Sequence, residues 1–173
     1  MTKETQTPSP ARKRAAARQV ILSVSGSVDG DDGDNVRLMT TGQLSGETDH
    51  WKLRYNETMP DSTLSNRITV SMDGDTVTMQ REGPFSTALV FQKGRRYEST
   101  YDTPFGSLDM GVYATRVHYS VQNGVGEVEL QYQLDVQGQF AAMRELSIQF
   151  APGKGKPRKR APKKPVIPMD QIL

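Results

Sequence analysis

The chain of 173 residues contains no cysteine, two histidines and one tryptophan. The absence of cysteine excludes disulfide bonds, thiol nucleophiles and cysteine-ligated zinc sites. The two histidines, His50 and His118, lie far apart in the sequence and do not show the spacing of metal ligands. Neither a G-x-S-x-G nucleophile elbow nor a P-loop occurs. We therefore expect a protein that is not an enzyme and that needs no metal and no cofactor.

Long apolar segments are also missing. The N-terminal region is polar and charged, and its most apolar stretch is the run of alanines at 15–17. A signal peptide needs an apolar core of about 7 to 15 residues, and a membrane-spanning helix needs about 20. These absences favour a cytoplasmic protein without a membrane contact.

Charge divides the chain into three parts. Residues 1–18 carry a net charge of +4 and residues 152–173 carry +6, whereas residues 19–151 carry −8. The central part has about the size of one domain and is long enough to bury a core. Charged ends that contain proline and few large apolar residues are typical of disordered segments. We therefore predict a disordered basic N-terminal tail at 1–18, one folded domain at 19–151 and a disordered basic C-terminal tail at 152–173.

The clearest structural signal is the alternation of polar and apolar residues from Glu127 to Gln137. Side chains of a β-strand point to opposite faces with a period of two, so this segment predicts a strand with one buried and one exposed face. Parallel strands are buried on both faces and read as continuous apolar runs, so the sheet should be antiparallel. The residues predicted to face the core are Val128, Leu130, Tyr132, Leu134 and Val136.

Short alternating segments separated by turn residues recur along the domain, and helical patterns are nearly absent. Asp73-Gly74 is a strong hairpin signal. Between Leu108 and Val121 the apolar positions change from even to odd numbers near Thr115, which predicts a β-bulge. The pattern gives eight to ten antiparallel segments joined by short turns. Such a sheet, with one dry face, must stack as a sandwich or close as an up-and-down barrel.

Four short motifs carry a resemblance to a known family. They are Tyr55-Asn56-Glu57, Arg81-Glu82-Gly83, Phe91-Gln92-Lys93-Gly94 and Tyr101-Asp102-Thr103-Pro104-Phe105-Gly106. Their order and spacing across roughly residues 19–150 resemble the YwiB-like family, a bacterial domain of unknown function. The resemblance implies an all-β, antiparallel, up-and-down calycin-like barrel of about eight strands, similar in architecture to lipocalins, so that some of the segments would be fused. It implies no activity, cofactor or binding site.

Three ionisable residues share the parity of the core-facing positions on their strands: Glu57, Arg81 and Arg144. Because a charge inside a barrel is costly unless it is paired, we expect Glu57 to pair with Arg81 or Arg144. Two interpretations stay open. The residues form a structural ion pair, or they anchor a small anionic or amphipathic ligand in the barrel interior. The aromatic residues expected to line that interior are Trp51, Tyr55, Phe91, Tyr132 and Phe140.

The C-terminal tail combines cations with prolines, and its basic stretch contains no aromatic residue. Such a segment neutralises phosphates but cannot stack on bases, so RNA binding through it would be nonspecific. Solubilising disorder and contact with the acidic domain are the alternatives. The candidate nucleic-acid-binding residues are Lys154, Lys156, Arg158, Lys159, Arg160, Lys163 and Lys164.

The sequence thus favours a non-enzymatic barrel that binds a small anionic or amphipathic ligand. The alternative is an RNA- or ribosome-associated accessory protein that binds through its basic tails.

Overall fold

The computed structural model describes residues 16–28, 36–58 and 61–153. The ten strands are β1 (Arg18–Val28), β2 (Val36–Glu47), β3 (His50–Thr58), β4 (Ser65–Asp73), β5 (Thr76–Glu82), β6 (Thr87–Gln92), β7 (Arg96–Thr103), β8 (Gly106–Gln122), β9 (Val125–Val136) and β10 (Gln139–Pro152). The described residues contain no helix that is long and apolar enough to cross a membrane. The predicted disorder of the tails concerns mainly residues 1–15 and 154–173, which lie outside the described residues.

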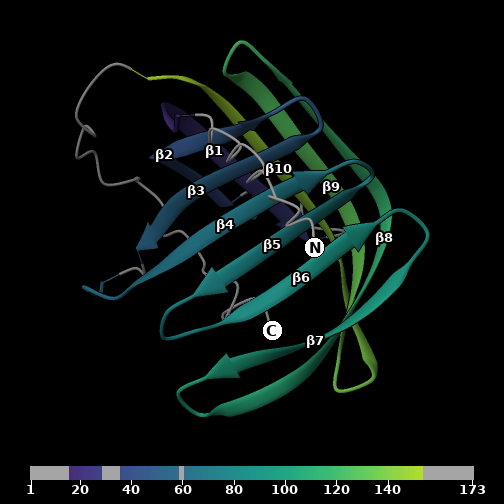
Figure 1. Cartoon of the computed structure of the whole chain (residues 1–173). Coiled ribbons are helices and arrows are strands. Elements are labelled where there is room, and N and C mark those ends of the chain that lie inside the picture. Colours follow the sequence, from purple (N-terminus) through teal and green to yellow (C-terminus); the bar gives the residue numbers. More distant parts are fainter. Residues whose placement is uncertain (1–15, 29–35, 59–60, 154–173) are drawn as a thin grey trace, which may run out of the picture.

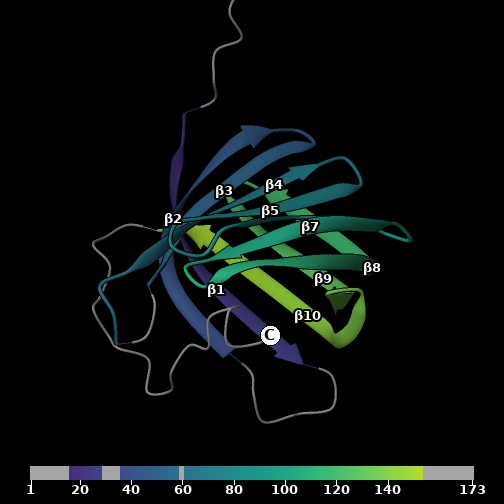
Figure 2. The same ribbon diagram turned by 90° about the horizontal axis from the view of Figure 1, so that it is seen from below.

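All ten strands belong to one antiparallel sheet with the order β6-β5-β4-β3-β2-β1-β10-β9-β8-β7. Neighbours along the chain pair with each other, except that β6 forms no ladder with β7, and β1 also pairs with β10. The sheet curls round so that β6 comes close to β7 and β8 (Figures 1 and 2). The protein is therefore a nearly closed ten-stranded barrel, which confirms the predicted all-β antiparallel architecture.

The number of strands is ten, not the eight that the family resemblance implied. The turn between β6 and β7 contains Gly94 with a φ of +75°, and the turn between β7 and β8 is followed by Gly106 with a φ of +131°. Glycine adopts positive φ at little cost, whereas other residues avoid it. The chain therefore reverses direction at both places, and the segments on either side stay separate strands.

The barrel closes along a seam between β6 and β7 that differs from the other strand contacts. At one end, Ser86 and Asp102 exchange two backbone hydrogen bonds of 2.8 and 3.0 Å. In the middle, the Ser99 hydroxyl donates to the carbonyl of Ala88 over 2.6 Å. A further backbone bond joins the turn after β6 to β8. Side-chain hydrogen bonds therefore replace regular backbone pairing in part of the seam.

The barrel interior is the hydrophobic core, because alternate side chains of each strand point inward. On β9 the predicted inward residues Val128, Leu130, Tyr132 and Leu134 are buried, and Val136 is half-buried. Full burial of one large aliphatic side chain stabilises a fold by about 1.5–3 kcal/mol. Among the described residues, the buried polar side chains are Asn66, Arg81, Thr87, Asp135 and Arg144.

Two β-bulges change which face a strand presents to the interior. The register of β8 against β9 shifts between Ala114 and Arg116, which confirms the bulge predicted near Thr115. A second register shift separates Phe140 from Ala142 on β10. The alternation is broken there, and Phe140 is 63% exposed. The prediction that Phe140 lines the interior was therefore wrong.

Candidate functional site in the barrel interior

An ion pair between β3 and β5 lies inside the barrel. Arg81 Nη2 donates to Glu57 Oε2 over 2.6 Å, and the side chains are 4% and 15% exposed, respectively. The register explains this contact, because Tyr55 on β3 pairs with Ile68 on β4, which in turn pairs with Arg81 on β5. Glu57 lies two residues beyond Tyr55 and faces the same side. The predicted pairing of Glu57 with an inward arginine is confirmed, with Arg81 as a partner.

Two buried tyrosines flank the ion pair. Burial raises the pKa of the Tyr55 phenol, and the Glu57 carboxylate raises it further against the opposing effect of Arg81. Burial also raises the pKa of Tyr132, and the positive charges of Arg144 and Arg81 oppose this shift. Both phenols therefore lie within electrostatic reach of Arg81, and both are neutral hydrogen-bond donors at neutral pH.

Arg144 is a second buried guanidinium in this part of the interior. It is 7% exposed and pairs with Tyr132 in the ladder between β10 and β9. Burial lowers the pKa of Arg144, because a low-dielectric interior disfavours the charged form. The Tyr132 ring lies against Phe91, with ring centroids 4.9 Å apart. Five residues predicted from the sequence thus form one group, which we call the Arg81 cluster: Tyr55, Glu57, Arg81, Tyr132 and Arg144.

Two polar residues beside the Arg81 cluster were not predicted as site residues. Asn66 pairs with Glu57 across β3 and β4, and Thr87 pairs with Arg81 across β5 and β6. Asn66 is fully buried, and Thr87 is 7% exposed. Strand phase was the available signal, because Asn66 lies two positions before the inward Ile68 and Thr87 lies two positions before the inward Leu89. Neither side chain is ionisable or aromatic, so the criteria that pointed to Glu57, Arg81 and Tyr55 did not apply to them.

Two buried donors at this site have no hydrogen-bond acceptor among the described residues: Arg81 Nη1 and Asn66 Nδ2. The other polar atom of the amide is satisfied, because Asn66 Oδ1 accepts from the backbone N–H of Phe85 over 3.4 Å. An unsatisfied buried donor costs about 1–3 kcal/mol, and more when it is charged. Since native proteins satisfy roughly 90% or more of such groups, these donors indicate an acceptor that the described residues do not supply.

The chemistry of the Arg81 cluster suits an anion. The two guanidinium groups, the two phenols and the Asn66 amide all carry hydrogen-bond donors, and the carboxylate of Glu57 is engaged by Arg81. Within the described part of the chain, no group of three or more His, Cys, Asp or Glu side chains is placed to hold a metal ion. A carboxylate or a phosphate therefore fits the donors better than a cation does.

Trp51 was predicted to line the same interior site, but it lies toward the other end of β3. It lies four positions before Tyr55, which is about 13 Å along a strand. The indole N–H donates to the carbonyl of Thr48 over 2.7 Å, and the half-buried ring lines an open depression together with Tyr119. Trp51 is therefore not a member of the Arg81 cluster, and its part in ligand binding stays a prediction. Parity gives the face of a strand on which a residue lies, but it does not give the depth along the barrel.

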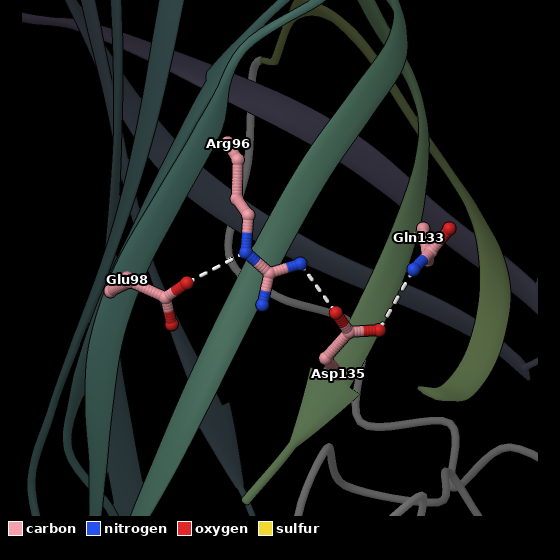
Figure 3. A network of polar contacts seen from close by, with 4 residues as sticks. All are labelled: Arg96, Glu98, Gln133 and Asp135. Atoms are coloured by element: carbon pink, nitrogen blue, oxygen red, sulfur yellow. Dashed lines mark hydrogen bonds and ion pairs between the residues drawn. The ribbon is translucent and has the colours of Figure 1, made fainter. Parts of the chain in front are cut away.

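A separate polar network lies on the outer surface of the barrel (Figure 3). Arg96 on β7 donates a hydrogen bond to Glu98 over 2.6 Å and another to Asp135 on β9. Asp135 also accepts a hydrogen bond from Gln133 Nε2 over 2.9 Å. Gly111 on β8 makes room for this arrangement, since a Cβ there would stand 2.1 Å from Arg96 Nη2. The hydrogen bonds from Gln133 and Arg96 lower the pKa of Asp135. We interpret this network, the outer brace, as a structural link that ties the edge strand β7 to β9 across β8.

The candidate nucleic-acid-binding residues fall outside the described residues. They are Lys154, Lys156, Arg158, Lys159, Arg160, Lys163 and Lys164.

Residues 22–148 match the family described as a domain of unknown function, DUF1934. The chain belongs to the DUF1934 family. The crystal structure of the YwiB protein from Bacillus subtilis is similar to this chain with a TM-score of 0.70 and 18% sequence identity, covering 82% of this chain and 96% of that chain. No curated protein matches the chain.

The comparisons confirm the resemblance to the YwiB-like family that the four motifs suggested. At 18% identity, the likeness to YwiB shows the fold alone. The further likeness to calycins and lipocalins stays a prediction. Membership of the DUF1934 family therefore gives this chain its architecture, and the function has to be argued from the Arg81 cluster.

Proposed function

We propose that this DUF1934 protein is a cytoplasmic, non-enzymatic binder of a small anionic or amphipathic molecule, which it holds inside the barrel at the Arg81 cluster. The observation that carries the proposal is the presence of two buried donors without an acceptor, Arg81 Nη1 and Asn66 Nδ2. A carboxylate or phosphate oxygen would satisfy them. Hydrogen bonds between a guanidinium and such an anion are roughly twice as strong as those between neutral groups.

Each member of the cluster has a defined part in this proposal. Arg81 uses Nη2 for Glu57 and offers Nη1 to the ligand. Glu57 orients the guanidinium and compensates its charge when no ligand is bound. Tyr55 and Tyr132 provide neutral donors, and Arg144 provides a second positive charge at the same site.

The surroundings of Arg81 favour a ligand with an apolar part. Ile68 and Leu89 are buried on the two strands that flank β5, and Phe91 is fully buried further along β6. An acid with a short hydrocarbon chain would place its head at Arg81 and its chain against these residues. Eight-stranded barrels are just filled or hold one small ligand, and barrel diameter grows with strand number, so ten strands leave more room.

Entry to this site requires movement of the protein. Neither the depression beside Trp51 nor a polar groove on the outer wall includes Arg81 among its lining residues. The β6–β7 seam offers a short route, because Thr87 pairs with Arg81 on one side and its hydroxyl lies 3.3 Å from that of Ser99 across the seam. The ligand we propose is therefore small.

Thermal unfolding in the presence of two anions tests the proposal. Phosphate represents a compact anion and octanoate an amphipathic one. A ligand present at about 100 times its dissociation constant stabilises the native state by about 2.7 kcal/mol. At least one of the two should raise the melting temperature of the wild type and leave that of Arg81→Met unchanged.

Arg116→Met is the matched control, because Arg116 lies on the outer face and pairs there with Glu129. This variant should respond to the anions as the wild type does. A shift of equal size in Arg81→Met, or no shift of the wild type with either anion, would contradict the proposal.

A second proposal concerns RNA, and the composition of the C-terminal tail supports it. Seven cations lie between residues 154 and 164, next to a domain that is acidic overall. Nonspecific binding through such a segment weakens steeply as salt increases. Truncation after Gly153 should therefore remove most of the affinity of the full chain for generic RNA, and undiminished binding by the truncated chain would reject the tail as the main site.

A further inference from the structure

The outer faces of β1 to β5 share one transverse row of polar side chains. These strands lie side by side (Figure 1), and their registers align one residue from each. The row consists of Gln19, Gln43, Arg54, Thr69 and Gln80. It runs along the floor of an open polar groove of about 700 Å³, which we call the β1–β5 groove.

Three cations line this groove: Lys52, Arg54 and Arg67. All three are exposed, and none forms an ion pair with another of the described residues. The outer face of β8 and β9 differs, because Arg116 is paired there with Glu129 over 2.5 Å. One carboxylate, Glu82, lines the groove opposite Arg67. The three cations therefore outnumber the anion in the groove, and this excess of positive charge attracts an external anion.

The spacing of the three charges favours a chain of anionic groups over a single anion. Lys52 and Arg54 are two residues apart on one face of β3, which is about 7 Å. Arg67 lies diagonally opposite Arg54, since the direct partner of Arg54 is Thr69, and diagonal neighbours are about 7–8 Å apart. The positive charge is therefore spread along a strip.

Both basic ends of the chain join the barrel at the edge of this groove. The backbone N–H of Gly153 donates to the carbonyl of Gln19 over 3.2 Å, and Gln19 belongs to the groove. Residues 1–18, with a net charge of +4, lead directly into Gln19, and the basic stretch that begins at Lys154 follows Gly153. The connectivity thus attaches two further basic segments to the same edge as the three groove cations.

We infer that the β1–β5 groove binds the sugar–phosphate backbone of single-stranded RNA. The three cations contact phosphates, and the neighbouring amides and hydroxyl of the row donate hydrogen bonds to phosphate oxygens. Contacts to phosphates carry no sequence information, so binding tolerates any sequence. The inference is independent of the interior ligand site and of the tail as the main source of affinity.

Glu82 favours RNA over DNA in this groove. Its carboxylate lines the groove and accepts a hydrogen bond from Gln80 Nε2 over 3.2 Å. A carboxylate repels phosphates, but it accepts readily from the ribose 2′-hydroxyl, a donor that DNA does not have. Glu82 therefore provides the groove with a means of telling the two polymers apart.

Fluorescence anisotropy with the full chain and a labelled oligouridine of about 16 nucleotides tests the inference, with a DNA oligomer of the same length as a second probe. The groove variant is Lys52→Gln/Arg54→Gln/Arg67→Gln. The control variant Lys93→Gln/Arg95→Gln/Arg116→Gln removes the same charge from other exposed positions. Circular dichroism confirms that both variants fold, which is expected because exposed substitutions change stability little.

For every protein, the logarithm of the binding constant should fall as the logarithm of the salt concentration rises. Each phosphate contact on a single strand contributes about 0.7 to this slope, so removal of three cations should make the slope of the groove variant smaller by about 2. The control variant should keep most of the wild-type slope. Glu82→Gln should reduce the preference for RNA over DNA. An equal loss in both triple variants, an unchanged slope in the groove variant, or no binding by the wild type would overturn the inference.

Discussion

The substitution Glu57→Gln measures how much the interior ion pair contributes to the free energy of unfolding. Glutamine has the same size and still accepts a hydrogen bond from Arg81, but it carries no negative charge. Because Arg81 is only 4% exposed, its positive charge would then lie in the interior without this carboxylate. The matched change on the other side is Arg81→Met, which removes the cation and keeps an apolar side chain of similar length.

Removal of one partner from a buried ion pair costs about 3–5 kcal/mol. The Glu57 side chain is 15% exposed. Water therefore reaches part of the pair, and we expect a loss near the lower end, about 3 kcal/mol, for Glu57→Gln. Arg81→Met should cost less, about 1–2 kcal/mol, because water reaches the 15% exposed Glu57 side chain and because the unsatisfied Nη1 donor is removed as well. The double variant should be more stable than Glu57→Gln alone.

Urea denaturation of the four proteins measures these free energies. The fluorescence of Trp51 and circular dichroism provide two probes of the same transition, since the chain has one tryptophan. A loss below about 0.5 kcal/mol in Glu57→Gln, with additive effects in the double variant, would contradict energetic coupling within a buried ion pair. The pair would then contribute no more than an exposed salt bridge does.

Three further predictions use the same denaturation assay. Leu130→Ala should cost about 2–5 kcal/mol because the side chain is buried, whereas Gln131→Ala should cost less than about 0.5 kcal/mol, and similar losses would contradict the face assignment of β9. Gly126→Ala should cost about 1–3 kcal/mol or more, because the new Cβ would stand 2.4 Å from the backbone oxygen of Ser120 and 2.5 Å from the buried Phe150 ring. A Gly126→Ala variant as stable as the wild type would contradict this clash. Asp135 has a lowered pKa, so the stability it adds is present above the unfolded pKa of about 3.9 and is lost as the pH falls through the folded value. The stability difference between wild type and Asp135→Asn should therefore be largest above about pH 5 and shrink towards pH 2, and a constant difference would contradict the outer brace.

The inward face of each strand could be predicted from local alternation. The period of two is a property of the strand itself, so Leu130 was placed in the core without knowledge of its neighbours. Glu57, Arg81 and Arg144 were placed in the interior by the same parity, and the cost of a buried charge predicted that Glu57 pairs with Arg81 or Arg144. The bulge near Thr115 was also visible, because it changes the parity within one strand.

Features that depend on strand pairing could not be read in this way. The depth of Trp51 along the barrel depends on how β3 is staggered against its neighbours. The break at Phe140 falls at the start of β10, where too few residues precede it to reveal a change of parity. The alignment of Gln19 with Arg54 depends on the registers of β1, β2 and β3 together. Asn66 was missed because its polar amide was taken as an ordinary strand residue, although its phase placed it inside.

Native mass spectrometry of the freshly purified full chain tests most directly whether the barrel interior holds an anionic ligand. If the Arg81 cluster holds such a ligand, a small acid will be bound to the wild type and to Arg116→Met and will be released by collisional activation, and no molecule will be bound to Arg81→Met. The bare protein mass for all three, from a wild type whose melting temperature responds to neither phosphate nor octanoate, would contradict this prediction.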